Sequence, residues 1–360
     1  DRGKWMDGWE TRRRREPGHD FCLIRLGLSG VVRRVNVDTS HFDGNQPESC
    51  RIEACHLERE PDPAELARDE EVWTTILDEA PLEGDSHNLF EIDADEAVTH
   101  LRFHILPDGG VARLRVYGEP MPDLDRLGRI GEYDVAGVQN GGRVVGVSDE
   151  HFGEASNLLL PTRPANMGEG WETRRRRGDG YDTVTVQLGA DAEIRRAVVD
   201  TEHFKGNYPA ACTLRGVRAP RDGSVPPEDA GWRTLLPKTA LRAHSDHRFE
   251  EELATAGPFT HVQMRIHPDG GVARIRLYGT FTEEGWRRRR LRELNAAPAR
   301  SASSRFLSCC GSEAWAEAMV ESRPYRSVDA VLDRAESVWR RLDEEDWLEA
   351  FAAHPRIGEE

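Results

Sequence analysis

Short segments in which apolar and polar residues alternate are the main pattern of residues 1–285, and they predict β-strands. The clearest are residues 22–26, 31–37, 101–105 and 111–116, with later counterparts at residues 184–188, 194–199 and 262–266. Glycine- and proline-containing turns separate many of them, as at residues 107–110. Many short strands joined by such turns indicate an all-β fold of the sandwich type.

The pattern changes to a helical period near the end of the chain. Residues 286–304 are rich in arginine, alanine and serine and are predicted to form a linker. After it, Ser312 and Ser327 are suitable N-caps for two helices, and a third helix is expected to follow Asp343. The third helix should bury Trp347, Leu348 and Phe351, and it must end before Pro355.

Three phrases occur twice in the same order, which reveals an internal duplication. Residues 8–15 recur at 170–177 and residues 37–45 recur at 199–207, both at an offset of 162, and residues 107–118 recur at 268–279 at an offset of 161. Each copy has the size of a domain. The stretch before the second arginine phrase, residues 134–167, has no counterpart, so the first copy is expected to be incomplete at its N-terminus. The predicted organisation is repeat 1 (residues 1–119), a linker (120–133), repeat 2 (134–285), a linker (286–304) and an incomplete helical region (305–360).

Charge and composition narrow the function classes. The net charge of −16 argues against nucleic acid or an anionic membrane as a partner. No stretch approaches the ~20 apolar residues of a membrane-spanning helix. The six cysteines do not form the pattern of a disulfide framework, and Cys50 and Cys212 are repeat equivalents that should be buried in strands. A reducing, cytoplasmic location is therefore predicted.

The duplicated phrase Asp-Thr-x-His-Phe-x-Gly-Asn places polar side chains at the end of a strand and on the loop after it, where binding residues concentrate. Its polar members are Asp38, His41 and Asn45 in the first copy and Asp200, His203 and Asn207 in the second. An aspartate and a histidine three residues apart can form a general base with its orienting carboxylate, or two metal ligands. The alternative is a scaffold loop whose aspartate and asparagine close turns.

The two arginine phrases could hold an anionic substrate, because a guanidinium group binds a carboxylate through two hydrogen bonds. On a strand, alternate arginines face opposite sides, so at most two in each copy could serve one site. A solvated edge strand that prevents aggregation explains the same residues. Zinc-ligand spacing, glycine-rich phosphate loops and nucleophile elbows are absent from the sequence, which weakens nucleotide and acyl-enzyme functions.

Together the repeated phrases resemble the allantoicase (allantoate amidinohydrolase) family over residues 1–285. The resemblance rests on residues 8–15, 38–45 and 107–118, on their echoes, and on residues 146–152 and 157–160. It implies two jelly-roll β-sandwich repeats of the galactose-binding-like type. It also implies hydrolysis of allantoate to ureidoglycolate and urea in purine breakdown.

The end of the chain resembles a second family, the OHCU (ureidoimidazoline) decarboxylases. Residues 306–312, 323–325, 346–351 and 354–359 carry the resemblance. It implies that His354, in the phrase His-Pro-Arg-Ile-Gly, corresponds to the catalytic histidine of that family. The family's later Ser-x-x-Glu-Gln phrase does not occur in this sequence, so decarboxylation by this chain is not expected. The gene is expected to encode a fusion of two enzymes of one pathway.

For allantoate hydrolysis, a base must activate water, an acid must protonate the departing nitrogen, and a cation must hold the carboxylate. The candidates for proton transfer are His41 and His203, with Asp38 and Asp200 as orienting groups or metal ligands and Glu10 and Glu172 as alternative carboxylates. Candidates for substrate binding are Arg13, Arg15, Arg175, Arg177, Asn45 and Asn207. The resemblance leaves open a divalent metal, with manganese as the candidate, and a homo-oligomer.

The sequence is also compatible with two other functions. A jelly roll can bind a small ligand without catalysis, because a fold alone does not determine function. The sandwiches could also be a scaffold for the decarboxylase region. Urea release separates the enzyme from the binding module, and turnover of the ureidoimidazoline alone would support the scaffold.

Overall fold

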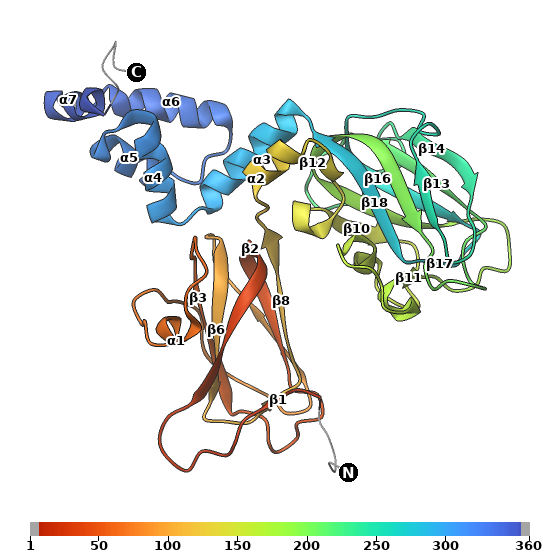
Figure 1. Cartoon of the computed structure of the whole chain (residues 1–360), viewed down its shortest axis with the longest axis horizontal. Coiled ribbons are helices and arrows are strands. Elements are labelled where there is room, and N and C mark those ends of the chain that lie inside the picture. The colour runs from red at the N-terminus through yellow and green to blue at the C-terminus, as the bar shows by residue number, and fades with distance from the viewer. Residues whose placement is uncertain (1–6, 354–360) are drawn as a thin grey trace. The chain divides into compact units, whose positions relative to one another are not determined.

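The computed structural model describes residues 7–353 and divides into two compact units (Figure 1). Among the described residues, one unit contains residues 7–121 and 293–353, and the other contains residues 122–292. Each holds one antiparallel β-sandwich, so the two expected sandwich repeats are confirmed. No helix within residues 7–353 is long and apolar enough to cross a membrane.

The first sandwich is organised around β2 (Asp20–Asp38), which belongs to both of its layers (Figure 1). Residues 20–25 of β2 pair with β6, whereas residues 30–38 pair with β8 and residues 34–38 with β5. Residues 22–26 and 31–37, expected to be two strands, are therefore one strand whose register shifts between Arg25 and Gly30. Glycine inside a strand permits such a bend, and Gly27 and Gly30 lie in this stretch. The other elements are β1 (Trp9–Glu10), β3 (Ser49–Cys55), α1 (Pro63–Leu66), β4 (Thr74–Pro81), β5 (His87–Glu91), β6 (Val98–Leu106), β7 (Gly110–Val111) and β8 (Arg113–Pro120).

The second sandwich repeats this plan around β12 (Asp182–Asp200). Residues 182–187 of β12 pair with β16 and those at 184–187 with β10, whereas the later residues pair with β18 and β15. The strands are β9 (Tyr133–Asp134), β10 (Arg143–Val147), β11 (Trp171–Glu172), β13 (Ala211–Val217), β14 (Arg233–Ala240), β15 (Asp246–Phe249), β16 (Phe259–His267), β17 (Gly271–Val272) and β18 (Arg274–Phe281). Helical segments are α2 (Leu124–Ile130) and the 3₁₀ turns η1 (Val138–Asn140), η2 (Ala155–Leu159) and η3 (Met167–Glu169). The expected linker at residues 120–133 thus contains α2, which Asp123 caps.

The alternation seen in the sequence corresponds to burial between the layers. In β18, Ile275 and Leu277 are fully or almost fully buried, and they pack in the same core as Val199 of β12 and Met264 of β16. Cys50 and Cys212 are completely buried in β3 and β13, as expected. Because apolar side chains occupy every second position, the intervening positions on the same strands point away from the core and are available for polar chemistry.

Helices follow the second sandwich, and they begin earlier than the sequence indicated. Residues 286–304, expected to form a linker, lie largely in α3 (Glu283–Ala296) and α4 (Ala299–Cys310). Arg287 and Arg288 form i,i+4 ion pairs with Glu283 and Glu284, which favours a helix in this arginine-rich stretch. Its alanines are also strong helix formers, so composition alone was a poor guide here.

The last three helices begin where the sequence predicted. Ser312, Ser327 and Asp343 cap α5 (Glu313–Glu321), α6 (Val328–Trp339) and α7 (Glu344–Ala352). The expected burial on α7 is wrong for Leu348, which is 61% exposed, and for Phe351, which is 65% exposed, and Trp347 is only half-buried. Helical period identifies an apolar face, but only packing against another element buries it.

Candidate functional site

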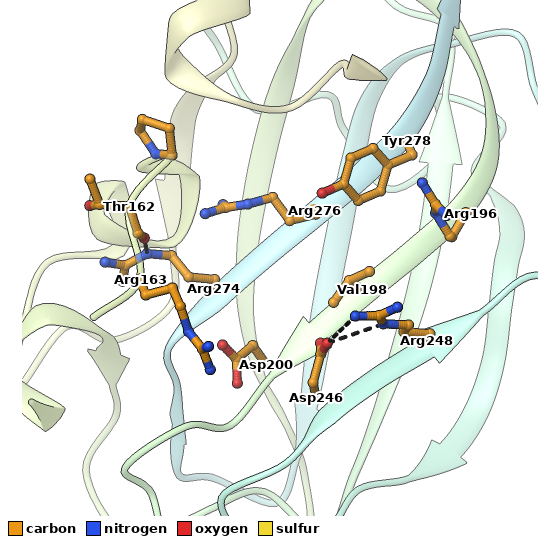
Figure 2. A pocket seen from close by; sticks show the side chains of 11 residues that line it. Thr162, Arg163, Arg196, Val198, Asp200, Asp246, Arg248, Arg274, Arg276 and Tyr278 are labelled. Carbon is orange, nitrogen blue, oxygen red and sulfur yellow. Dashed lines mark hydrogen bonds and ion pairs between the residues drawn. The ribbon is translucent and has the colours of Figure 1, made fainter. Parts of the chain in front are cut away.

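A polar pocket lies on the outer side of the layer that contains the second half of β12 (Figure 2). Its volume is about 380 Å³. Its walls come from β12, β15, β18 and the segment before η3. The lining residues are Pro161, Thr162, Arg163, Arg196, Val198, Asp200, Asp246, Arg248, Arg274, Arg276 and Tyr278. Because five of them are arginines, we call this cavity the arginine pocket.

Strand register brings these side chains together. Arg274, Arg276 and Tyr278 are alternate residues of β18, so they face the same side. Asp200 of β12 lies opposite Arg274 on β18 and opposite Asp246 on β15. The pocket is therefore formed by the polar positions that alternate with the buried core residues of the same strands.

Arg274 is the most deeply buried cation of the pocket, with a side chain that is 3% exposed. Its Nε donates to the carbonyl of Thr162 at 2.8 Å, and one Nη donates to the carbonyl of Glu169 at 2.6 Å. Its other Nη has no hydrogen-bond partner among the described residues and lies 4.0 Å from the Glu169 carboxylate. Burial, with the nearby Arg276, lowers the pKa of Arg274. A buried N–H group without a partner favours an incoming acceptor such as a carboxylate.

The charges of the pocket also suit an anion. Five arginines and two aspartates line it, which leaves three positive charges in excess. Three of the arginines already form close ion pairs with carboxylates. Arg163 pairs with Glu202 and Arg248 with Asp246, each at 3.1 Å, and Arg196 pairs with Glu132 at 3.0 Å. A small substrate that carries one carboxylate would enter a field of the opposite sign.

Asp200 is the carboxyl group at the centre of this pocket. Among the described residues, its carboxylate accepts one hydrogen bond, from the backbone N–H of Glu202 at 2.7 Å. Burial raises the pKa of Asp200, and the carboxylates of Glu202 and Asp246 add to this effect against Arg163. A carboxyl group with a raised pKa in an open pocket is suited to proton transfer at neutral pH.

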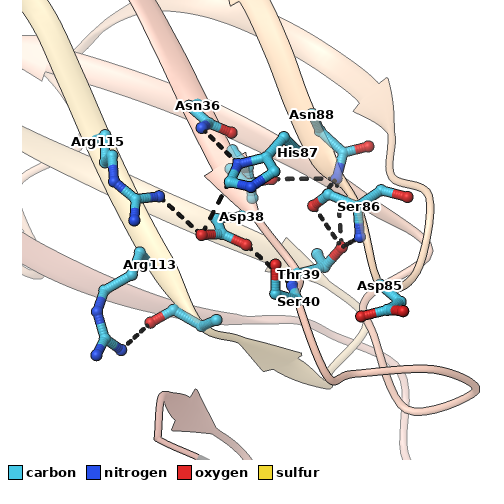
Figure 3. Close-up of polar contacts among 12 residues, drawn as sticks. Asn36, Asp38, Thr39, Ser40, Asp85, Ser86, His87, Asn88, Arg113 and Arg115 are labelled. Carbon is cyan, nitrogen blue, oxygen red and sulfur yellow. Dashed lines mark hydrogen bonds and ion pairs between the residues drawn. The ribbon is translucent and has the colours of Figure 1, made fainter. Parts of the chain in front are cut away.

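The equivalent Asp38 in the first sandwich has a different environment (Figure 3). Arg115 donates to its carboxylate at 2.7 Å, the backbone N–H of Ser40 donates at 3.0 Å, and His87 lies 3.8 Å away. Burial opposes ionisation of Asp38, but the hydrogen bonds from Arg115 and Ser40 outweigh it and hold its pKa well below the usual range. The charge of the Asp38 carboxylate is thus balanced by an ion pair with Arg115. Asp200 forms no such ion pair among the described residues.

The two candidate histidines occupy matching, strained positions. His41 and His203 have φ values of 71° and 70°, in the left-handed region that non-glycine residues seldom adopt. The backbone N–H of His41 donates to Asp85, and that of His203 donates to Nδ1 of His244 at 2.8 Å. The ring of His203 also contacts the carbonyl of Pro164 through Nε2 at 3.0 Å. Neither ring belongs to the lining of the arginine pocket.

The structure brings two other pairs of candidate residues together. Asn45 donates to Glu10 at 2.9 Å, and Asn207 donates to Glu172 at 2.7 Å. Each pair ties the loop after the long strand to the short strand β1 or β11. This contact gives a structural reason for the repeated asparagine and glutamate, which is independent of any role in substrate binding.

The four arginines of each phrase lie outside the strands, contrary to the strand geometry considered from the sequence. The backbone N–H groups of Arg14 and Arg176 donate to Asp108 and Asp269, both at 2.7 Å. The candidates Arg13, Arg15, Arg175 and Arg177 are exposed, and Arg175 and Arg177 do not line the arginine pocket. His354 lies outside the described residues.

Of the candidate residues that the structure describes, only Asp200 lines the arginine pocket, and its other polar lining residues were missed. The missed polar residues are Arg163, Arg196, Asp246, Arg248, Arg274, Arg276 and Tyr278. One signal could have found three of them, because Arg274, Arg276 and Tyr278 alternate with apolar residues directly after the Pro-Asp-Gly-Gly turn. The others come from separate segments that only the sheet register joins.

No group of three or more His, Cys, Asp or Glu side chains within residues 7–353 could hold a metal ion. The arginine pocket holds two aspartates among five guanidinium groups. This donor set does not fit a manganese ion, which prefers several oxygen ligands without nearby cations.

Comparison with known families agrees with this architecture. The family model of the allantoicase repeat matches residues 1–121 and 133–282, which is well over half of the chain. The chain belongs to the allantoicase family. A second family model, OHCU decarboxylase, matches residues 295–360, so the allantoicase repeats are fused to an OHCU decarboxylase region.

Several relatives of this allantoicase are similar over most of their length. A probable allantoicase of Stutzerimonas stutzeri (strain A1501) is 50% identical over 281 residues, which is 78% of this chain and 83% of the relative. One of Pseudomonas fluorescens (strain SBW25) is 48% identical over 285 residues, covering 79% and 85%. The crystal structure of allantoicase from Saccharomyces cerevisiae superposes with a TM-score of 0.66 at 33% identity, covering 76% of this chain and 81% of that chain. The protein is accordingly an amidinohydrolase of purine degradation with allantoate as its small-molecule substrate.

Proposed function

We propose that allantoate is hydrolysed in the arginine pocket of the second sandwich, with Asp200 as the proton-transfer group. The observation that carries this proposal is the position of Asp200. Within residues 7–353 its carboxyl group is held by one backbone N–H and by no side chain, and it lies in a pocket with an excess of three positive charges. The positive charge favours binding of an anionic substrate, and the carboxyl group without a side-chain partner can exchange protons with it.

Binding begins with the carboxylate of allantoate. The Nη of Arg274 that lacks a partner among the described residues provides a buried donor, and Arg276 lies next to it on the same face of β18. Guanidinium groups hold a carboxylate in a fixed plane, so the carbon that bears both ureido groups is oriented towards Asp200. Arg196, Arg248 and Tyr278 supply donors for the ureido carbonyls on the other side of the pocket.

The chemical step exchanges one ureido group for a hydroxyl group. Ionised Asp200 accepts a proton from the attacking water as the new C–O bond forms, and it returns that proton to the departing nitrogen as the C–N bond breaks. The products are ureidoglycolate and urea, and the carboxylate is regenerated. A raised pKa makes the ionised form of Asp200 a stronger base.

The six cysteines are all free thiols, which supports a reducing cytoplasmic location. A homo-oligomer and a role for His41 and His203 stay predictions. The same is true of the exposed arginines of the two repeated phrases.

The test is a product assay with purified 360-residue protein and allantoate, which follows urea and ureidoglycolate with and without EDTA or added manganese. Wild type should release both products in equal amounts. Asp200→Asn should lower kcat about 10²–10⁴-fold, the typical contribution of acid–base catalysis. Asp38→Asn is the matched control, and it should retain most of the activity. Full turnover by Asp200→Asn would refute this site, and binding of allantoate without urea release would support a binding module.

A further inference from the structure

Arg276 and Arg115 occupy equivalent positions on β18 and β8, yet they contact different groups. Arg115 lies opposite Asn36, two residues before Asp38, and donates to the Asp38 carboxylate at 2.7 Å. Arg276 lies opposite Val198, two residues before Asp200, in the same register. Its guanidinium group instead donates to the carbonyls of Leu158 and Leu160. The register permits a pairing with the aspartate, but Arg276 does not form it.

Asp134 is the acidic residue on the other side of Arg276. It lies on β9, which pairs with β18, and it is 6% exposed. Oδ1 of Asp134 accepts hydrogen bonds from the backbone N–H groups of Leu277 at 3.0 Å and Ala136 at 3.2 Å. Oδ2 has no hydrogen bond among the described residues and lies 3.7 Å from Nε of Arg276. The buried carboxylate of Asp134 therefore faces Nε of Arg276.

We propose that Asp134 is a positioning residue that holds Arg276 away from Asp200 and so keeps the Asp200 carboxylate available for proton transfer. The proposal rests on the function proposed above for Asp200. The carbonyls of Leu158 and Leu160 share the task, because they accept from the outer nitrogens of the guanidinium group while Asp134 faces Nε.

The charges around Asp200 show why this restraint matters. Carboxylates of Glu202 and Asp246 face Asp200, and Arg163 and Arg274 are the cations beside it. Arg163 is already paired with Glu202, and Arg274 is held by backbone carbonyls. Arg248 is paired with Asp246. Arg276 is thus the cation whose release would neutralise Asp200, as Arg115 neutralises Asp38.

The pKa of Asp134 is consistent with a moderate attraction between its carboxylate and Arg276. Burial raises the pKa of Asp134 to about 6, against the opposing effects of the Leu277 N–H and Arg276. At neutral pH the carboxylate is therefore mostly ionised and attracts Arg276. An isolated buried charge is unfavourable, so the ion pair and the two backbone hydrogen bonds are needed to retain it.

The test is the pH dependence of allantoate hydrolysis by Asp134→Asn. The amide keeps an acceptor for Leu277 and Ala136 but removes the charge. Arg276 should then turn to Asp200 and lower its pKa, so the acid limb of the kcat profile should move to lower pH by about one to three units. The plateau of kcat should fall, because a weaker base transfers the proton more slowly. A purely structural role for Asp134 would lower the melting temperature without moving the limb, and that result would overturn the proposal.

Arg276→Gln provides a second test that does not depend on the folding of Asp134 variants. If ionised Asp134 keeps Arg276 from Asp200, kcat of Arg276→Gln should match that of wild type above pH 7, where Asp134 is ionised, although KM should rise. A move of the limb to higher pH would show that Arg276 pairs with Asp200 in the native enzyme, which would overturn the proposal. The double variant Asp134→Asn/Arg276→Gln should have the same acid limb of kcat as Arg276→Gln. The guanidinium group that would turn to Asp200 is absent from both variants.

Direct titration separates this proposal from the proposed function. Carbon-13 resonances of labelled aspartate carboxyls, assigned with Asp200→Asn, report the pKa of Asp200 without turnover. A lowered pKa of Asp200 in Asp134→Asn supports the positioning role even if the kinetic limb does not follow. In that case Asp200 is not the proton-transfer group, and the proposed function fails. An unchanged pKa of Asp200 overturns the positioning role alone.

Discussion

Asp200 and Arg274 lie directly opposite each other on β12 and β18, at the end of the two strands that form the floor of the arginine pocket. Their side chains nevertheless do not pair with each other, because backbone carbonyls of Thr162, Glu169 and Ala273 hold the guanidinium group. An aspartate and an arginine therefore lie in one small pocket without forming an ion pair with each other.

Arg274 should contribute chiefly to substrate binding. Replacing it with glutamine removes the buried donor to the substrate carboxylate, so KM for allantoate should rise by about ten- to a hundredfold, as expected for loss of a charged hydrogen bond. Measurement of KM and kcat separately tests this role. Arg113→Gln, the equivalent change on β8, is the matched control, and an equal effect of both variants would contradict a site confined to the second sandwich.

The pH dependence of turnover should reveal Asp200. Because burial raises its pKa and the base must be ionised, activity should fall as pH decreases through a value above the ordinary aspartate pKa of about 3.9. A profile of kcat/KM between acid and neutral pH measures this limb. It should disappear in Asp200→Asn together with most of the activity, and an acid limb that persists there would identify another group.

His203 should have a smaller effect than Asp200, because its ring does not line the pocket and is bonded to the carbonyl of Pro164. Asparagine is the suitable replacement, since it tolerates the left-handed backbone at this position. We expect kcat of His203→Asn to stay within about tenfold of wild type, well short of the loss for removal of an acid–base group. His41→Asn is the control in the first sandwich. A loss as large as that of Asp200→Asn would restore His203 as the proton-transfer residue.

His261 should make the stability of the second sandwich sensitive to acid. Burial, with repulsion from Arg221, lowers its pKa from 6.5 to about 4. Below about pH 6.5 the unfolded chain binds a proton that the folded protein excludes, so the free energy of unfolding should decrease between pH 6.5 and 4, by up to about 3 kcal/mol. Chemical denaturation at several pH values measures the slope. His261→Gln should flatten it, and an unchanged slope would assign the acid sensitivity to other groups.

Much of the fold could be predicted from the sequence. The duplication, the β-sandwich class and the three capped helices depend on local patterns, namely repeated phrases, alternation with a period of two and N-cap residues. The differences between the predicted and the observed elements also have local causes. Gly27 and Gly30 allow β2 to bend instead of ending, and the ion pairs of Arg287 and Arg288 turn an expected linker into a helix.

The candidate site was less accessible from the sequence. Asp200 was identified because it belongs to a repeated phrase, but the sequence treats Asp38 and Asp200 as equivalent. Only the tertiary structure separates them, since Arg115 neutralises Asp38 whereas Asp134 and the carbonyls of Leu158 and Leu160 retain Arg276. The charge and pKa of a carboxyl group depend on burial and on partners distant in the chain. The sequence therefore determined the family, the repeats and the residue types, and the packing of β9, β12 and β18 decided which aspartate forms an ion pair with the arginine of the neighbouring strand.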